Sequence, residues 1–95
     1  MVIRSFQDDD VERFFKKGTV PLRKGWANVK SIAQRKLDMM QYAKELKDLR
    51  TPPANRLESL SGDLKGYYSI RINDQWRIIF RWDTKPYDVQ IVDYH

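Results

Sequence analysis

The chain has no cysteine and only one histidine, His95, and these two absences exclude several site chemistries. Disulfide bonds and thiolate metal sites both require cysteine. A single imidazole does not supply the ligand set of a histidine-based metal site. We therefore expect no metal site, no disulfide framework and no cofactor.

Long apolar runs are also absent. No segment approaches the roughly 20 apolar residues that a membrane-spanning helix needs, and no signal-peptide pattern is visible. With 95 residues, 41% hydrophobic content, three Trp, five Tyr and four Phe, the chain can build one modest core. The composition predicts a single cytoplasmic domain over residues 1–95 that does not associate with a membrane.

Acidic residues are missing from residues 13–37, a stretch that contains eight Lys or Arg. The whole chain has a formal net charge of +5, which favours an anionic partner such as nucleic acid or an acidic protein. Such a run is often only a solvated face, but cations near a helix N-terminus oppose the helix dipole. We interpret it as a docking surface for nucleic acid or an acidic partner, with Lys30, Arg35 and Lys36 as its candidate RNA-binding residues.

The first half of the sequence predicts one short strand and two helices. Residues 2–6 form the strand, and one of the three following aspartates caps a helix over Asp9–Lys17, which Gly18 ends. Residues 21–43 form the second helix, because apolar residues recur there every three or four positions. Residues 50–56, with two prolines, break regular structure.

Residues 66–95 show the alternating pattern of half-buried strands. Three runs of β-branched and aromatic residues are separated by turn chemistry at residues 73–75 and 83–86, so they predict an antiparallel meander. One face is apolar, and the other carries three arginines within a small area: Arg71, Arg77 and Arg81.

These arginines have two interpretations. They are either solvated and paired with nearby acids, or they form a phosphate cradle, because a guanidinium binds phosphate oxygens bidentately. For Arg81 both interpretations stay open, whereas Arg71 and Arg77 favour the cradle. The chain ends Asp93, Tyr94, His95, and such a tail beside arginines can transfer protons and stabilise charge, although a terminal histidine is often only a frayed end.

The stretch GDLKGYYSIRINDQWRIIFRW and the ending IVDYH resemble the HigB toxins of the RelE/ParE toxin-antitoxin superfamily, as do VIRSFQDDDVERFF and RTPPANRLESLSGD. The resemblance covers nearly the whole chain. It implies an α+β, RelE-like fold in which a short N-terminal strand and two helices pack on an antiparallel meander. It also implies a toxin of a type II toxin-antitoxin system, with a HigA-like antitoxin that carries a helix-turn-helix, and with the ribosome and mRNA as partners.

The resemblance further implies an endoribonuclease that cuts mRNA on the ribosome without a metal. Arg77, in the W-R motif, is expected to hold the scissile phosphate, and Arg71 to follow the RNA backbone. Asp93, Tyr94 and His95 match the D-Y-H ending and are expected to take part in proton transfer and RNA contact. Some members carry a His and a Lys in the loop that runs from the two prolines to Gly62, here called the proline loop, where this sequence has Glu58 and Ser61.

This departure leaves the general base unassigned. Arg56 and Lys65 are expected to replace the lost positive charge, and Glu58 is a second loop candidate. Two other functions stay open. Relatives that resemble ParE act on DNA gyrase and are not nucleases, and a weakened relative would only bind its antitoxin or RNA.

Overall fold

The computed structural model describes residues 3–21 and 24–93. Helix α1 spans Asp9–Lys17 and begins at Asp8, whose carboxylate accepts a hydrogen bond from the Asp10 N–H at 2.8 Å. It ends at Gly18, which adopts the left-handed conformation with φ 73°. The predicted first helix, its aspartate cap and its glycine end are therefore confirmed.

The second predicted helix begins later than the sequence pattern indicated. A 3-10 helix, η1, covers Gly25–Val29, and helix α2 follows over Lys30–Tyr42. Pro21 and Lys24 lie outside both helices. The Gly25 backbone packs against the Trp76 ring, where a Cβ would lie 2.5 Å from Cζ2 of Trp76. This tertiary contact tightens the first turns. The predicted apolar face is confirmed, with buried Trp26, Ala33, Leu37 and Met40.

Short elements connect α2 to the sheet. The 3-10 helix η2, Leu46–Arg50, is followed by η3, Pro53–Asn55, within the predicted proline loop. Strand β1, Glu58–Ser59, then joins the sheet, and η4, Gly62–Leu64, leads to the next strand. Strand β1 was not predicted, because a pair of residues is too short to show an alternating pattern.

The predicted antiparallel meander is confirmed. Strands β2, Tyr68–Arg71, β3, Trp76–Asp83, and β4, Lys85–Asp93, follow β1 in a four-stranded sheet of order β1-β2-β3-β4. Asn73 fixes the β2–β3 turn, because its side-chain oxygen accepts hydrogen bonds from the N–H groups of Gln75 and Trp76. The next turn is tighter than expected: only Thr84, with φ 61°, separates β3 from β4.

The N-terminal segment does not form the predicted strand. Val2 lies outside the described residues, and residues 4–7 run beside β4 as a single parallel bridge between Phe6 and Val89. Three backbone hydrogen bonds hold the segment there: Arg4 N–H to Pro86 O, Gln7 N–H to Val89 O, and Val89 N–H to Ser5 O. The segment therefore covers the outer edge of β4.

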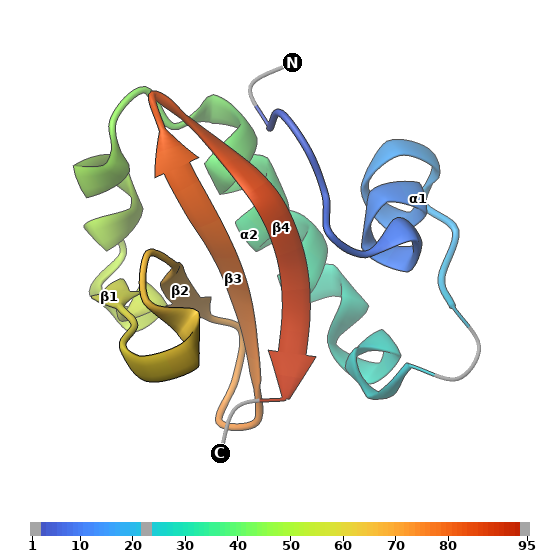
Figure 1. The fold of residues 1–95 in the computed structure, drawn as a ribbon. Coiled ribbons are helices and arrows are strands. Elements are labelled where there is room, and N and C mark those ends of the chain that lie inside the picture. Colours follow the sequence, from blue (N-terminus) through green and yellow to red (C-terminus); the bar gives the residue numbers. More distant parts are fainter. Residues whose placement is uncertain (1–2, 22–23, 94–95) are drawn as a thin grey trace.

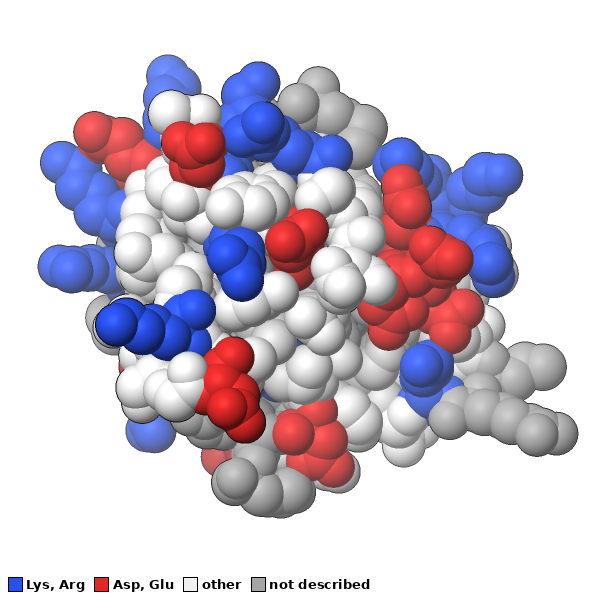
Figure 2. All heavy atoms as spheres, in the orientation of Figure 1, with Lys and Arg blue, Asp and Glu red and all other residues white. Residues whose placement is uncertain are grey.

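The layers leave one sheet face available for a site. Helix α2 lies behind the sheet and α1 lies beside β4, as Figure 1 shows. The core fills the space between helices and sheet, where Leu37 and Met40 pack with Ile70, Ile78 and Phe80. The other face, turned toward the viewer in Figure 1, is the open face. In Figure 2 its centre is largely uncharged, and acidic residues gather over α1.

Candidate active site

Arg77 is the most constrained of the predicted site residues. It is the second residue of β3, and only 8% of its surface is exposed. One terminal nitrogen donates hydrogen bonds to the Ser69 hydroxyl at 2.9 Å and to the Arg56 carbonyl at 3.4 Å. The other terminal nitrogen lies 3.7 Å from a carboxylate oxygen of Glu58. These contacts fix the guanidinium in one orientation.

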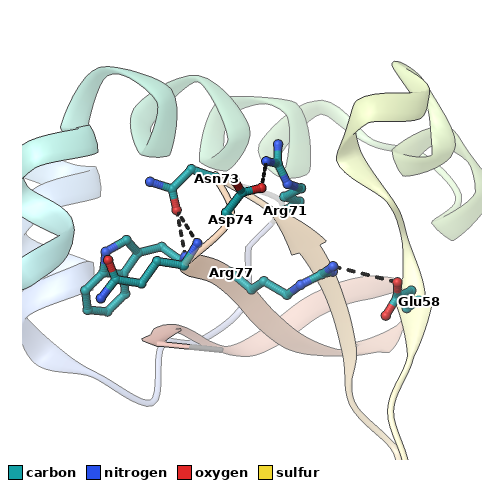
Figure 3. Close-up of polar contacts among 7 residues, drawn as sticks. Glu58, Arg71, Asn73, Asp74 and Arg77 are labelled. Atoms are coloured by element: carbon teal, nitrogen blue, oxygen red, sulfur yellow. Dashed lines mark hydrogen bonds and ion pairs between the residues drawn. The ribbon is translucent and has the colours of Figure 1, made fainter. Parts of the chain in front are cut away.

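Glu58 reaches Arg77 because of the unpredicted strand β1. Glu58 pairs with Ser69 across the β1–β2 ladder, and Ser69 itself contacts Arg77. Figure 3 shows the Arg77 side chain extending from β3 toward Glu58. The Glu58 side chain is about half exposed, at 48%, so it is open to a bound ligand. The sequence pattern indicated Glu58 only as a second candidate in the loop, and it gave no signal for Ser69 as a site residue.

Arg71 lies beside Arg77, because the two residues pair directly across β2 and β3. Its guanidinium forms a close ion pair with Asp74 in the hairpin turn (Figure 3). The hydrogen bond and charge of Arg71, and then the charge of Arg56, hold the pKa of Asp74 below its ordinary value. Two of the three predicted arginines thus lie together, and Asp74 neutralises one of them.

Lys36 contributes a buried cation near this group. It is 7% exposed and donates a hydrogen bond to the side-chain oxygen of Asn55, which is fully buried. The Asn55 side-chain nitrogen in turn donates to the carbonyls of Leu49 at 3.1 Å and Thr51 at 3.4 Å. Burial lowers the pKa of Lys36, and the charges of Arg35 and Arg71 lower it further. Lys36 therefore joins α2 to the proline loop and is not an exposed docking charge.

The last described residue of the chain lies at the Arg77 end of the sheet. Asp93 pairs with Trp76, and the preceding residue, Val92, pairs with Arg77. The Asp93 carboxylate accepts a hydrogen bond from the Gln75 side chain at 3.1 Å. The predicted catalytic residues Tyr94 and His95 lie outside the described residues.

Arg81 is not part of this cluster. It lies four residues along β3 from Arg77, or about 13 Å at the rise of a strand. The expected grouping of three arginines in a small area is therefore wrong, because Arg81 lies at the opposite end of the open face. Lys65 is exposed and precedes β2, so it lies toward the Arg81 end. The docking candidates Lys30 and Arg35 are exposed on α2.

A cavity of about 360 Å³ adds two cations that the sequence had not identified. It lies beside Glu58, and the exposed residues Lys47 and Arg50 belong to its lining. The remaining lining residues are Leu46, Leu57, Ser59 and Tyr68.

A fixed guanidinium beside an accessible carboxylate supports a definite chemistry. The guanidinium can stabilise negative charge on phosphate oxygens, and a carboxylate can accept a proton from a hydroxyl group. Because Arg77 is largely buried and already oriented, little reorganisation is needed when charge develops on a bound phosphate. The arrangement suits displacement at a phosphodiester.

The fold is that of a class of small α+β toxins. A structural neighbour is the YoeB-YefM complex from Staphylococcus aureus, with a TM-score of 0.59 and 20% sequence identity over 98% of this chain and 94% of that chain. At this identity the likeness establishes the fold alone, and it confirms the RelE-like α+β architecture.

The sequence comparisons define the family. Residues 4–95 match the model described as RelE-like toxin of type II toxin-antitoxin system HigB. Toxin HigB-1 of Vibrio cholerae is 46% identical over 56 residues, which are 59% of each chain. Endoribonuclease HigB of Proteus vulgaris is 32% identical over 98 residues, covering 99% of this chain and all of that protein. The chain belongs to the HigB-like toxin family.

No helix among the described residues is long and apolar enough to cross a membrane.

Proposed function

We propose that this toxin is an endoribonuclease that cuts mRNA on the ribosome and so inhibits translation in the cytoplasm. The observation that carries the proposal is the buried Arg77 guanidinium, held by Ser69 and flanked by Glu58 on the open face. The name of the Proteus vulgaris relative, which aligns over its whole length, supports a nuclease.

The proposed reaction is attack of an RNA 2′-hydroxyl on the adjacent phosphorus. The new 2′-oxygen–phosphorus bond forms as the bond to the 5′-oxygen of the next nucleotide breaks. The products are a 2′,3′-cyclic phosphate and a 5′-hydroxyl. One proton leaves the attacking hydroxyl and one joins the leaving oxygen, so the protein supplies positioning, charge stabilisation and proton transfer, with no metal required.

In the proposal, each site residue has a part in positioning, charge stabilisation or proton transfer. Arg77 holds the scissile phosphate and stabilises its growing charge. Glu58, 3.7 Å from Arg77 and half exposed, accepts the proton of the attacking hydroxyl. The tail, Asp93 to His95, supplies the proton for the leaving oxygen, and Tyr94 contacts the RNA. Arg71 and Arg56 follow the neighbouring RNA backbone, and Lys65 extends this positive surface.

Docking and regulation are assigned to other surfaces. In the proposal, Lys30 and Arg35 on α2 contact ribosomal RNA, because exposed cations can neutralise its phosphates. A HigA-like antitoxin with a helix-turn-helix is proposed as the cognate inhibitor, since type II toxins of this family are paired with antitoxins.

The test is to express the chain without an antitoxin and to map the 5′ ends of cellular mRNAs. We expect new cuts inside translated regions, and their loss from a reporter whose start codon has been removed. The variant Arg77→Gln and a deletion of His95 should abolish the cuts, whereas Lys44→Gln, at an exposed position after α2, should retain them. Growth arrest without new cuts would reject the nuclease and favour a non-nuclease target such as DNA gyrase.

A further inference from the structure

A row of alternating aromatic and arginine side chains crosses the sheet at the end away from Arg77. The Arg81 guanidinium lies over the Tyr67 ring, 4.7 Å from its centroid, and Arg81 pairs directly with Tyr87 across β3 and β4. Arg4, in the segment beside β4, lies over the Tyr87 ring at 5.8 Å. We call these four residues, Tyr67, Arg81, Tyr87 and Arg4, the aromatic–arginine row.

The fold holds the row in place with a bulge in β4. The register of β3 and β4 shifts between Ile79 and Arg81, and Asp88 adopts a left-handed conformation there, with φ 52°. Ser5 fixes this conformation: its hydroxyl accepts from the Asp88 N–H at 2.9 Å and donates to the Asp88 carboxylate at 3.2 Å. Bulges re-aim side chains and are frequent beside functional sites. Here the bulge turns Tyr87 toward Arg81.

The arginines of the row are only loosely paired with acids. Arg81 lies 3.8 Å from the Asp88 carboxylate, and Arg4 lies 3.7 Å from that of Asp83. The Arg81 side chain is 42% exposed and that of Arg4 is 53% exposed. Ion pairs of this length and exposure are weak, so Asp88 and Asp83 leave the exposed parts of the two guanidiniums able to contact a phosphate group.

One end of the row opens into a hollow. A cavity of about 430 Å³ is lined by Arg4, Ser5, Asp83 and Tyr87. Its volume is in the range of small-molecule sites, its wall includes an aromatic ring, and its rim carries a guanidinium. The row and the hollow therefore offer stacking surfaces, a cation and an acceptor carboxylate in one place.

We propose that the aromatic–arginine row and its hollow bind unpaired bases of single-stranded RNA that flank the nucleotide held at Arg77. Proteins read single-stranded RNA mainly by stacking unpaired bases on aromatic rings and on guanidinium planes. The row shares the open face with Arg77 and lies about 13 Å along β3 from it, a distance that a short stretch of extended RNA spans. This inference rests on the proposed function and names the part of the RNA that this second site holds.

The test measures binding of a fluorescent nine-nucleotide RNA by anisotropy, with every protein in the Arg77→Gln background so that no RNA is cut. Tyr67→Leu and Tyr87→Leu should each weaken binding by about tenfold, because each removes one stacking surface. The slope of affinity against salt should stay unchanged, since neither variant removes a cation. Tyr67→Phe and Tyr87→Phe retain the rings and should bind within about twofold of the parent.

The matched control is Tyr42→Leu, which removes a tyrosine that is 80% exposed at the end of α2 and should leave binding unchanged. Thermal unfolding of each variant separates lost stacking from lost structure, and the Phe variants test the rings where a Leu variant is unstable. The proposal is overturned if the parent binds no RNA, or if folded Leu variants bind as tightly as the parent. If the Leu variants retain RNA binding, and the same substitutions made with Arg77 intact let the toxin escape neutralisation by a co-expressed antitoxin, the row would instead be assigned to a protein partner. Failure of the nuclease proposal would appear separately, as an absence of cuts in cells.

Discussion

The molecule has two basic regions that hold their charges in opposite ways. At the Arg77 end of the sheet, Arg77 is 8% exposed and its guanidinium is fixed by Ser69, Glu58 and a backbone carbonyl. Along α2, Arg35 is exposed, whereas Lys36, the next residue, is buried against Asn55. Charge density along the sequence is highest in the helical half, but the ordered, oriented charge lies in the sheet. The first arrangement suits chemistry at one phosphate, and the second suits diffuse attraction to RNA.

The largest expected difference between the two regions is the effect of a charge-conserving substitution on the cutting rate. Arg77→Lys should lower the cutting rate of a reporter transcript by about 10²- to 10³-fold, as the loss of one oriented donor does in other enzymes. An ammonium group cannot reproduce the separate contacts to Ser69 and Glu58. Arg35→Lys, at an exposed position, should leave the rate unchanged. Equal cutting rates for Arg77→Lys and Arg35→Lys would show that the two regions do not differ in their need for an oriented guanidinium.

The second effect concerns the buried link between α2 and the proline loop. Asn55→Ala should lower the free energy of unfolding by about 2 kcal/mol, because it leaves the Lys36 ammonium and two backbone carbonyls without their partner. Urea denaturation measures this change. Asn28→Ala, at an exposed position in η1, is the control and should change stability by less than about 0.5 kcal/mol. A loss of similar size in both would show that the Lys36–Asn55 contact does not stabilise the loop.

A third effect tests the docking role of the exposed helix charges. The double variant Lys30→Glu, Arg35→Glu should weaken co-sedimentation with ribosomes by about tenfold at physiological salt and make the salt dependence shallower. Its stability should be nearly unchanged, because both side chains are exposed. An unaltered salt slope would argue that α2 does not meet RNA.

The smallest effect is a pH dependence of stability that belongs to Lys36. Its pKa is lowered in the folded chain by burial and by the nearby arginines, so the unfolded chain binds more protons at alkaline pH. The free energy of unfolding should therefore rise with pH as the solution passes from the lowered pKa toward the ordinary lysine value. Lys36→Met should lose this rise. Identical pH profiles for the two proteins would show that Lys36 does not titrate in this way.

Local chemistry made much of the fold predictable. A cap by one of three aspartates and the end at Gly18 predicted α1 from sequence, and the alternating residues predicted β2, β3 and β4. The features that escaped prediction depend on distant contacts. The start of the second helix depends on the packing of Gly25 against Trp76, and β1 exists because Glu58 pairs with Ser69.

The site was predictable by residue type more than by geometry. The W-R motif identified Arg77, and helical spacing places Lys36 beside the apolar positions Ala33 and Met40. The contact of its ammonium with Asn55 in the proline loop could not be predicted, because it joins distant parts of the chain. The distance of Arg81 from Arg77 follows from their four-residue spacing within one strand, so the alternating pattern was sufficient to predict it. Its pairing with Tyr87 depends on a bulge in β4, which an alternating pattern does not reveal.

The N-terminal segment beside β4 has a consequence for when the sheet is completed during translation. Ser5 contacts Asp88 across 83 positions of sequence, and the central strand β3 needs β4 as its neighbour. Contacts this far apart in sequence form late, and a chain emerging from a ribosome folds from its N-terminus onward. A nascent chain that stops before β4 lacks the strand that pairs with β3 beside Arg77. It also lacks the strand edge on which residues 4–7 lie. The strand that borders Arg77 on one side, and the edge on which residues 4–7 lie, are therefore both completed only when β4 has been made.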